Sequence, residues 1–396
     1  MFENVSPLAP DPLLGISIAY AADENPNKVD LGVGVYKDDE GNTPIFSAVK
    51  MAEQRLITTQ ATKAYIGSAG SSEYNRLMSE LMFGPSHIAL TEKRLATVQT
   101  TGGCAALRVA AEFIKRTSEA VVWVSDPTWA NHQPLLGDAG LTLNTYPYYD
   151  QENNSILFED MVAALEKVPA GDVVLLHGCC HNPSGADLTD EQWVVVADIA
   201  VRRGFLVFID LAYQGFGRGL NEDAFGVRLM ADRLPELVVA SSCSKNFSIY
   251  RERAGTLCIV TKTASQADAV QTHLNKIVRG IYSMPPAHGA SIVETLLSDH
   301  QLTANWQSEL ASVRQRVKQL RNGLSDALEE HVQHDRFDFI RHQSGMFSFL
   351  GITPDQVERL KDQYSIYIAG SSRINVAGLN KPVIPYVAGA IADVIR

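Results

Sequence analysis

The stretch Val238-Val-Ala-Ser-Ser-Cys-Ser-Lys-Asn-Phe247 joins an apolar, β-branched run to a lysine that is set among small hydroxyl residues. Such a run is typical of a buried strand, and burying a lysine is costly unless it is paired or loses its proton. Taken alone, Lys245 would be interpreted as a solvated surface charge. Two upstream segments favour a different interpretation.

Both upstream segments end an apolar strand with polar residues. Phe205-Leu-Val-Phe-Ile-Asp210 ends in a carboxylate, and His181-Asn-Pro-Ser-Gly185 follows the run Val173-Val-Leu-Leu-His177. Parallel strands bring their carboxyl ends to one edge of an open α/β sheet, where ligands bind. A lysine for a Schiff base, an aspartate for a pyridinium nitrogen and an asparagine for a ring oxygen predict a pyridoxal-phosphate site.

The surrounding pattern predicts an α/β fold. Between about residues 95 and 260, short β-branched runs alternate with helical segments, which indicates a mostly parallel sheet covered on both faces. The helix between two of these runs is marked by a capping box at Thr189 and Gln192 and by Gly204 after its end. The runs are Val121–Val124, Leu141–Leu143, Val173–Leu176, Leu206–Ile209, Val238–Ala240 and Thr256–Val260.

A second region predicts one long amphipathic helix. From Leu302 to Leu328 apolar residues recur at spacings of mostly four and three, and about 27 helical residues would span roughly 40 Å. After it, Phe337–Arg341 and Gly345–Leu350 are expected to be strands. We therefore expect a large domain at residues 46–300 and a small domain made of residues 1–45 with 301–396, with a linking helix at about 302–330.

The bulk composition excludes several classes of function. The net charge of −11 argues against nucleic acid, and it means that an anionic substrate must be bound by particular arginines. The five cysteines include one vicinal pair and no C-x-x-C spacing, so we expect neither disulfides nor a metal site. Without a signal peptide or an apolar run of about 20 residues, we expect a cytoplasmic protein that binds no membrane.

Motifs along essentially the whole chain resemble the aspartate and aromatic aminotransferase family, which are dimeric fold-type-I pyridoxal-phosphate enzymes. The resemblance implies a mostly parallel seven-stranded sheet between helices in the large domain, a smaller α+β domain from both chain ends, and a homodimer with shared active sites. The motifs are Trp129-Ala-Asn-His132, His181-Asn-Pro-Ser-Gly185, Asp210-Leu-Ala-Tyr-Gln-Gly-Phe216, Ser244-Lys-Asn-Phe247, Pro285-Pro-Ala-His-Gly289 and Arg373-Ile-Asn-Val-Ala-Gly378.

The resemblance assigns the Schiff-base and proton-shuttle role to Lys245. Asp210 would pair with the pyridine nitrogen, and Tyr213 and Asn182 would reach the ring oxygen, although a lone aspartate after a strand more often caps the next turn. Trp129 would stack on the ring, unless it is a core tryptophan. His132 and His177 would support Asp210 or be ordinary buried histidines.

The phosphate requires a helix amino terminus and a cation. Residues 100–108 supply Gly102 and Gly103 at a helix start, and Arg253 would provide a bidentate contact supported by Ser242 and Ser244. In the family, the position of Cys104 usually carries a hydroxyl residue. A thiol is a weaker donor, so the phosphate would depend more on the other groups.

Two arginines would determine the substrate, because the planar guanidinium binds a carboxylate through two donors. The resemblance implies that Arg373 binds the α-carboxylate and that Arg279, from the neighbouring subunit, binds the distal one. Tyr65 would cross the dimer to the cofactor phosphate, and Gly34 would line the substrate site.

The expected function is transfer of the amino group of L-aspartate, and of aromatic amino acids, to 2-oxoglutarate by a ping-pong mechanism through pyridoxamine phosphate. The alternative is a primarily aromatic aminotransferase for tyrosine and phenylalanine. Val35, Lys37 and Thr43 resemble the aspartate-preferring members, whereas Met284 replaces their usual asparagine and is more apolar.

Other functions fit the sequence less well. A pyridoxal-phosphate lyase or decarboxylase would share Lys245 and Asp210 but would not need Arg279. Gly32-Val-Gly34 and Gly215-Phe-Gly-Arg-Gly219 lack the third glycine of a dinucleotide fingerprint. A non-enzymatic small-molecule-binding protein would not need a lysine, a carboxylate and a phosphate site at one sheet edge.

Overall fold

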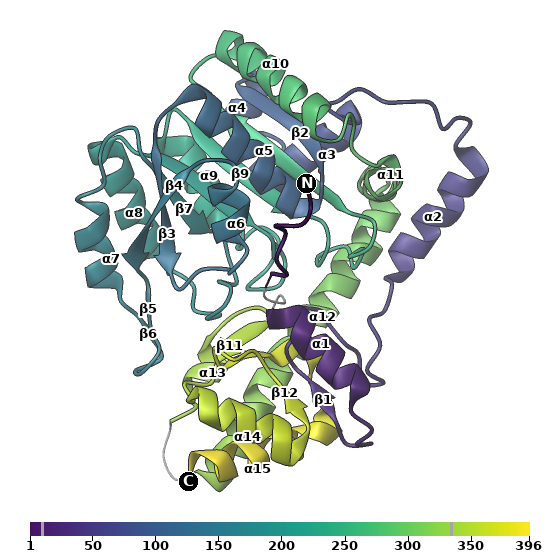
Figure 1. Ribbon diagram of the computed structural model, residues 1–396. Coiled ribbons are helices and arrows are strands. Elements are labelled where there is room, and N and C mark those ends of the chain that lie inside the picture. The colour runs from purple at the N-terminus through teal and green to yellow at the C-terminus, as the bar shows by residue number, and fades with distance from the viewer. Residues whose placement is uncertain (9–11, 333–335) are drawn as a thin grey trace.

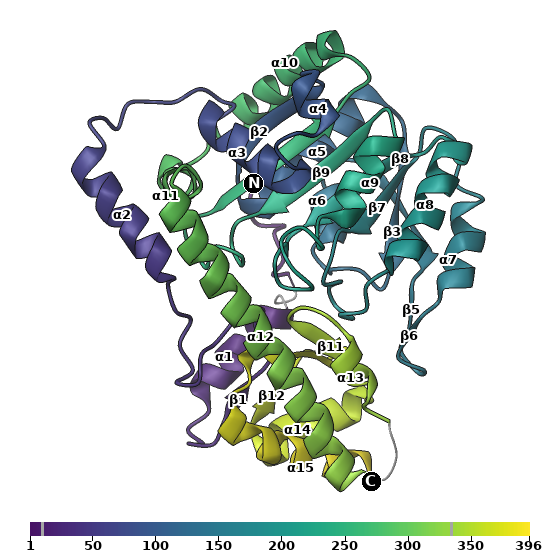
Figure 2. The same ribbon diagram turned by 180° about the vertical axis from the view of Figure 1, so that it is seen from behind.

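The computed structural model describes residues 1–8, 12–332 and 336–396. A large α/β body and a smaller body lie at opposite ends of the long helix α12 (His300–His331) (Figure 1). Turned to the opposite side, the molecule shows α12 descending from beside α11 (Ala287–Leu297) across the smaller body (Figure 2).

The central sheet of the large body has seven strands and is mostly parallel, which confirms the predicted fold class. Strands β9, β8, β7, β3 and β4 pair in parallel, and β10 is antiparallel to both of its neighbours. In sheet order the strands are β2 (Leu95–Thr101), β10 (Ala254–Val260), β9 (Leu237–Ser242), β8 (Leu206–Leu211), β7 (Val173–His177), β3 (Val121–Asp126) and β4 (Thr142–Pro147).

Helices cover both faces of this sheet, because its central strands are apolar on both sides. On one face lie α5 (Gly102–Thr117), α6 (His132–Gly137) and α10 (Ala264–Ile281). The other face packs against α3 (Ser72–Phe83), α7 (Phe158–Leu165), α8 (Asp190–Arg203), α9 (Phe225–Arg233), α11, and the first half of α12, with α2 (Ser47–Thr59) outside α11 and α12. The predicted capping box at Thr189 begins α8, and Gly204 ends it in the left-handed conformation.

The predicted long helix is observed as α12, which begins at the capping carboxylate of Asp299. Its apolar stripe belongs to two cores. Leu302 to Val317 pack into the core of the large body, and Leu320 to Leu328 pack into that of the smaller body. The domain bounds, residues 46–300 and residues 1–45 with 301–396, stay a prediction, and the first half of α12 packs in the large body.

The smaller body is built from both ends of the described chain. β1 (Val29–Asp30) pairs in parallel with β12 (Ile366–Tyr367), and β11 (Phe347–Phe349) pairs antiparallel with β13 (Arg373–Asn375). These strands pack with α12, α14 (Pro354–Tyr364) and α15 (Ile384–Ile395), while α1 (Pro12–Ala22) contacts β1. The strand predicted in Gly345–Leu350 is therefore confirmed as β11.

The strand predicted at Phe337–Arg341 is wrong. These residues form a turn followed by the short helix α13 (Phe339–His342). Phe337 and Ile340, three residues apart, are both buried in the small core, which is helical rather than strand spacing. Asp338 also pairs with Arg341 three residues ahead, as helical neighbours do.

The topology brings the predicted polar groups to one edge of the sheet. β2 runs in the same direction as β9, because both are antiparallel to β10. The carboxyl ends of β2, β7, β8 and β9 therefore lie at the same edge. Among the described residues, no helix combines the length and apolar character that crossing a membrane requires.

Candidate active site

A cavity of about 260 Å³ lies at this sheet edge and is lined by most of the predicted site residues. It also reaches β11 and β13, so residues from the smaller body contribute to its wall. Its lining consists of Gly34, Gly103, Cys104, Leu107, Trp129, His177, Asn182, Asp210, Ala212, Tyr213, Ser242, Ser244, Lys245, Tyr250, Arg253, Phe347 and Arg373.

Lys245 lies in the loop between β9 and β10, three residues after β9 ends. Its Nζ atom lies 4.5 Å from the centre of the Tyr213 ring. Burial lowers the pKa of Lys245, Asp210 opposes this shift, and the charge of Arg253 adds to it. The net result is an amine that loses its proton more readily than an ordinary lysine.

Asp210 is the last but one residue of β8, and it is held by His132 at the start of α6. The Nε2–H group of His132 donates to Oδ2 of Asp210 at 3.2 Å. Burial alone would raise the pKa of Asp210. The hydrogen bond from His132 and the positive charge of neighbouring groups outweigh burial, so the pKa lies below its ordinary value and the carboxylate is ionised.

Behind His132, the hydroxyl of Thr128 connects two histidines. It lies 2.8 Å from Nδ1 of His132 and 3.1 Å from Nε2 of His177. Burial, together with the charge of His132, lowers the pKa of His177 to about 3, so this ring is neutral at neutral pH. Both histidines thus lie in one hydrogen-bonded chain with Asp210, and His177 lines the cavity.

An anion cradle closes one end of the cavity, and we use this name for Gly102, Gly103, Cys104, Ser242, Ser244 and Arg253. The first turn of α5 begins at Gly102, and the preceding Thr101 makes no capping hydrogen bond through its side chain. The amides of that turn therefore lack intrahelical acceptors. A Cβ atom at Gly102 would lie 2.5 Å from Nη2 of Arg253, so only glycine allows the guanidinium to approach this turn.

The remaining side chains of the anion cradle are already linked to each other. Nη1 of Arg253 donates to Oγ of Ser244 at 3.2 Å, and Oγ of Ser242 donates to the same oxygen at 3.1 Å. Burial raises the pKa of Cys104, so its thiol is protonated. Backbone amides, two hydroxyls and one guanidinium are the donors that bind phosphate groups in proteins.

At the other end of the cavity, Arg373 is 6% exposed and lies among neutral partners. It donates to Oδ1 of Asn182 at 3.3 Å and to the carbonyl of Gly32 at 2.8 Å, and its guanidinium lies 4.4 Å from the Phe347 ring centre. Its Nε atom finds no hydrogen-bond partner among the described residues. Within the described residues, no carboxylate forms an ion pair with Arg373. A buried guanidinium in this state is ready to bind an anionic ligand.

Three predicted site residues do not line the cavity. Gly102 is the residue before Gly103, which does line the cavity. Tyr65 is 93% exposed, and Arg279 is exposed in the last turn of α10, where Nη1 donates to Oγ of Ser283 at 2.5 Å. Both assignments required a second subunit, so a single chain leaves them as predictions.

Sequence reasoning missed Leu107, Ala212, Tyr250 and Phe347 as parts of the cavity wall. Leu107 follows the glycines of α5 by one helical turn, so the helix start was a usable signal. Tyr250 comes five residues after Lys245, and its hydroxyl accepts from the backbone amide of Tyr36 at 3.2 Å. Nothing near Phe347 in the sequence indicates its role, because it reaches the cavity from the smaller body.

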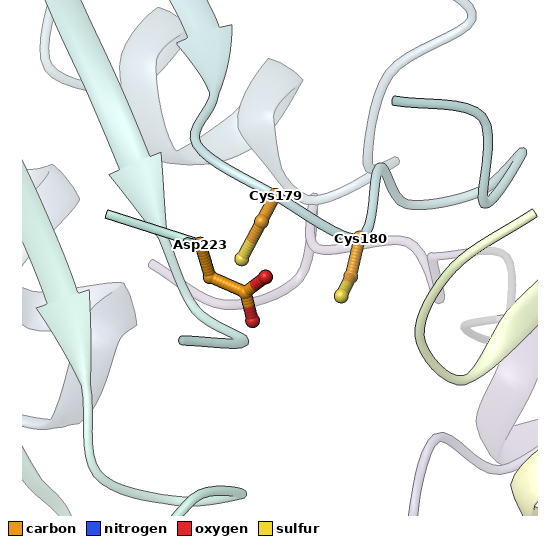
Figure 3. Close-up of side chains that lie close together, drawn as sticks. All are labelled: Cys179, Cys180 and Asp223. Carbon is orange, nitrogen blue, oxygen red and sulfur yellow. The ribbon is translucent and has the colours of Figure 1, made fainter. Parts of the chain in front are cut away.

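Outside the cavity, three buried groups with metal-ligand chemistry lie close together (Figure 3). One ligand atom each from Cys179, Cys180 and Asp223 lie within 4.8 Å of one another. The Asp223 carboxylate already accepts hydrogen bonds from four backbone amides of residues 215–219. The hydrogen bond that the Cys179 thiol donates to Cys180 raises the pKa of Cys179, and burial raises that of Cys180 to about 11. Because metals bind thiolates, we interpret this group as part of the core.

Comparison with known proteins agrees with this geometry. The family model described as aminotransferase class I and II matches residues 26–391. An aspartate aminotransferase of Salmonella typhi is 46% identical over 396 residues, and an aromatic-amino-acid aminotransferase of Paracoccus denitrificans is 47% identical over 395 residues, with 100% of each chain covered in both cases.

Among solved structures, an aromatic-amino-acid aminotransferase from Burkholderia pseudomallei, covalently bound to pyridoxal phosphate, matches with a TM-score of 0.98. It is 40% identical, and 100% of each chain is covered. The resemblance inferred from the motifs is thereby confirmed: the chain belongs to the class I and II aminotransferases.

Proposed function

We propose that this chain uses pyridoxal phosphate to transfer the amino group of L-aspartate, and of aromatic amino acids, to 2-oxoglutarate by a ping-pong mechanism. The observation that carries the proposal is one cavity that contains an easily deprotonated lysine, an ionised aspartate, an anion cradle and a buried arginine that forms no ion pair within the described part of the chain. Relatives named as aspartate and as aromatic-amino-acid aminotransferases support both substrate classes.

The chemistry of the cavity fits this cofactor. The anion cradle would hold the phosphate, the Asp210 carboxylate would pair with the ring nitrogen, and Trp129 would cover one ring face. Asn182, whose Oδ1 accepts from Arg373, keeps its Nδ2 donor for the ring oxygen, with the Tyr213 hydroxyl. When bound, pyridoxal phosphate supplies an aldehyde and a conjugated ring that accepts electrons from the substrate carbon.

Lys245 is the proposed base. Its Nζ must be neutral to take the proton from the α-carbon of the amino acid, and burial shifts its pKa in the required direction. Lowering the pKa of an amine increases its neutral fraction at any given pH. For the Asp210 carboxyl, a lowered pKa has the opposite effect on charge: it keeps the group ionised, as pairing with the ring nitrogen requires.

Arg373 would bind the α-carboxylate of the substrate. Two of its nitrogens are held by Asn182 and Gly32, which leaves the orientation of the guanidinium plane determined before substrate arrives. Binding a carboxylate there would provide the negative partner that the buried guanidinium lacks. Preorganisation of this kind reduces the ordering that the substrate must undergo when it binds.

We assign Tyr65 and Arg279 to the active site of a partner subunit, and we therefore propose a homodimer with two shared sites. Their exposure in the single chain supports this assignment, because neither side chain reaches the cavity of its own subunit. A cytoplasmic location is also part of the proposal, supported by five free cysteines.

The principal test is spectroscopic. Purified protein with bound cofactor is expected to show visible absorbance that disappears when aspartate is added and returns when 2-oxoglutarate is added. The kcat/KM values for aspartate, tyrosine and phenylalanine then rank the substrates. A spectrum that does not respond to any amino acid would reject aminotransferase function, and a negligible kcat/KM for aspartate would favour the primarily aromatic alternative.

Arg279→Ala is expected to reduce kcat/KM for aspartate by roughly 10²-fold or more, because a site built around a buried polar contact discriminates strongly when that contact is lost. Phenylalanine, which has no distal carboxylate, should lose much less. The two kcat/KM values measured on one preparation give the comparison. An equal loss for both substrates would mean that Arg279 does not bind the distal carboxylate. That result would also favour the alternative of a lyase or decarboxylase.

Mixing variants tests whether Arg279 acts across the dimer. Lys245→Ala and Arg279→Ala each damage both sites of their own homodimer. In a mixed dimer, one site combines the intact Lys245 of one chain with the intact Arg279 of the other. Reassociated mixtures should therefore recover up to about a quarter of the wild-type aspartate activity. No recovery in mixtures proven to contain mixed dimers would place Arg279 in the site of its own chain.

A further inference from the structure

A buried arginine outside the cavity lies where the two bodies of the molecule meet. Arg321 is 2% exposed and lies on α12 between Val317, which packs in the core of the large body, and Leu324, which packs in that of the smaller body. It is one of the largest fully buried side chains of the described residues. Nothing in the proposed chemistry uses it, so its burial requires a separate explanation.

Every nitrogen of the Arg321 guanidinium donates to one short segment, residues 340–348. Nη1 donates to the carbonyl of Ile340 at 3.1 Å and to Oγ of Ser348 at 2.7 Å, and Nε donates to the carbonyl of Gly345 at 3.1 Å. Nη2 donates to the carbonyls of Ser344, Gly345 and Phe347 at 3.1, 2.8 and 2.5 Å.

These acceptors are all neutral. Within the described residues, no carboxylate forms an ion pair with Arg321. Burial lowers the pKa of Arg321 to about 10, so the group is still charged at neutral pH. A buried charge without an ion-pair partner is costly, whereas the five N–H groups of one planar guanidinium, shared among six contacts, hold a segment of irregular backbone in a single conformation.

The segment that Arg321 holds packs directly against the loop that carries Asn182. The amide of Ser344 donates to the carbonyl of Gly185 at 2.7 Å. Gly185 has a φ of +72°, and a Cβ atom there would overlap the carbonyl oxygen of Phe347 and lie 3.1 Å from Nη2 of Arg321. This close approach leaves no space for either side to shift independently.

The segment held by Arg321 and the loop that contains Gly185 both lead to a residue that contacts Arg373. Phe347 continues into β11, where Phe349 is paired with Arg373 on β13. The Phe347 ring lies 4.4 Å from the Arg373 guanidinium, and Asn182 accepts a hydrogen bond from it. The backbone held by Arg321 therefore carries Phe347, and it packs against the loop that carries Asn182.

We propose that Arg321 is a positioning residue for substrate binding: it holds residues 344–348 against the Gly185 loop and so determines where Arg373 presents its guanidinium to a substrate carboxylate. The inference rests on the proposed function, because it requires Arg373 to bind that carboxylate. It predicts an effect on carboxylate affinity without a matching effect on the anion cradle, which comes from α5 and the β9–β10 loop.

The test replaces Arg321 by methionine, which keeps much of the volume but donates no hydrogen bonds, and by lysine, which keeps the charge without the planar fork. The dissociation constant of succinate for the protein with bound cofactor is measured by calorimetry, together with KM for aspartate and the dissociation constant of the cofactor. Arg314→Met serves as the matched control, because Arg314 lies on the same helix but its Nη1 donates to the carbonyl of Gly215 in the large body.

We expect Arg321→Met to weaken succinate binding and raise KM for aspartate by about tenfold or more, with Arg321→Lys between it and wild type, because buried directed contacts of a charged group are costly to lose. Cofactor affinity should change by less than about threefold in either variant. Arg314→Met should leave all three quantities near wild type.

Unchanged succinate affinity in folded Arg321→Met would overturn the inference, and so would an equal loss of succinate and cofactor affinity, which would indicate general loosening. If Arg321→Met does not fold, Ser348→Ala provides the test, because it removes one acceptor of Arg321. This variant should weaken succinate binding several-fold, and an unchanged dissociation constant refutes the inference. Wild-type protein without aminotransferase activity would instead reject the proposed function.

Discussion

Lys245→Ala is expected to reduce aspartate turnover by roughly 10⁴-fold or more, because the variant loses both the covalent anchor of the cofactor and the base that removes the α-proton. No other lysine lines the cavity in the part of the chain that the structure describes. The effect should be on kcat, since Arg373 and the anion cradle remain in place. Steady-state kinetics and the visible spectrum of the purified variant provide the measurement.

Lys262→Ala is the matched control for this variant. Lys262 is exposed beyond the end of β10 that lies far from the cavity, and its nearest carboxylate, on Glu236, is 3.9 Å away. Exposed pairs of this kind contribute little, so spectrum and turnover should match wild type. Wild-type absorbance or substantial turnover in Lys245→Ala would remove the central assignment of the proposal.

Asp210→Asn is expected to lower kcat by roughly 10²–10³-fold, the range found when one preorganised electrostatic contact is removed from an active site. The amide has nearly the same shape as the carboxylate and still accepts a hydrogen bond from His132 through its oxygen. It carries no negative charge, however, and cannot stabilise a protonated ring nitrogen. Kinetics and a pH titration of the cofactor absorbance should show the loss together.

Thr128→Val separates the charge of Asp210 from the hydrogen-bonded chain behind it. This change removes the hydroxyl that connects His132 with His177 but leaves the His132–Asp210 hydrogen bond. We expect a loss below about tenfold, in keeping with one neutral hydrogen bond. If Thr128→Val were as damaging as Asp210→Asn, the arrangement of the chain, and not the carboxylate charge, would be the important property.

Local sequence patterns predicted the helices and strands correctly wherever one segment buries an apolar face of its own. The six β-branched runs all correspond to strands of the central sheet, and the capping box at Thr189 begins α8 as expected. The stripe from Leu302 to Leu328 predicted α12 within three residues at either end. At Phe337–Arg341 this reasoning failed, because the alternation of aromatic and charged residues was compatible with both a strand and a helix, and packing of Phe337 and Ile340 into the small core favours the helix.

The candidate site was predictable to the extent that it lies at strand ends. Lys245 and Asn182 follow strands β9 and β7, and Asp210 lies at the end of β8; the carboxyl ends of these strands must meet in a parallel sheet. Phe347 and Arg321 had no such signal. The segment that contains Phe347 and is held by Arg321 reaches the site through a contact with a distant part of the chain, the hydrogen bond from Ser344 to Gly185.

The family, the sheet with its helices and the types of chemical group at the cavity could all be predicted from residue identity and short-range periodicity. Three properties of the site depend instead on how the chain folds: among the described residues, the Nε of Arg373 has no partner, Asp210 is ionised beside His132, and the acceptors around Arg321 are neutral. The physical reason is that the energy of a charge depends on burial and on every neighbour within a few ångströms, and distant segments supply those neighbours.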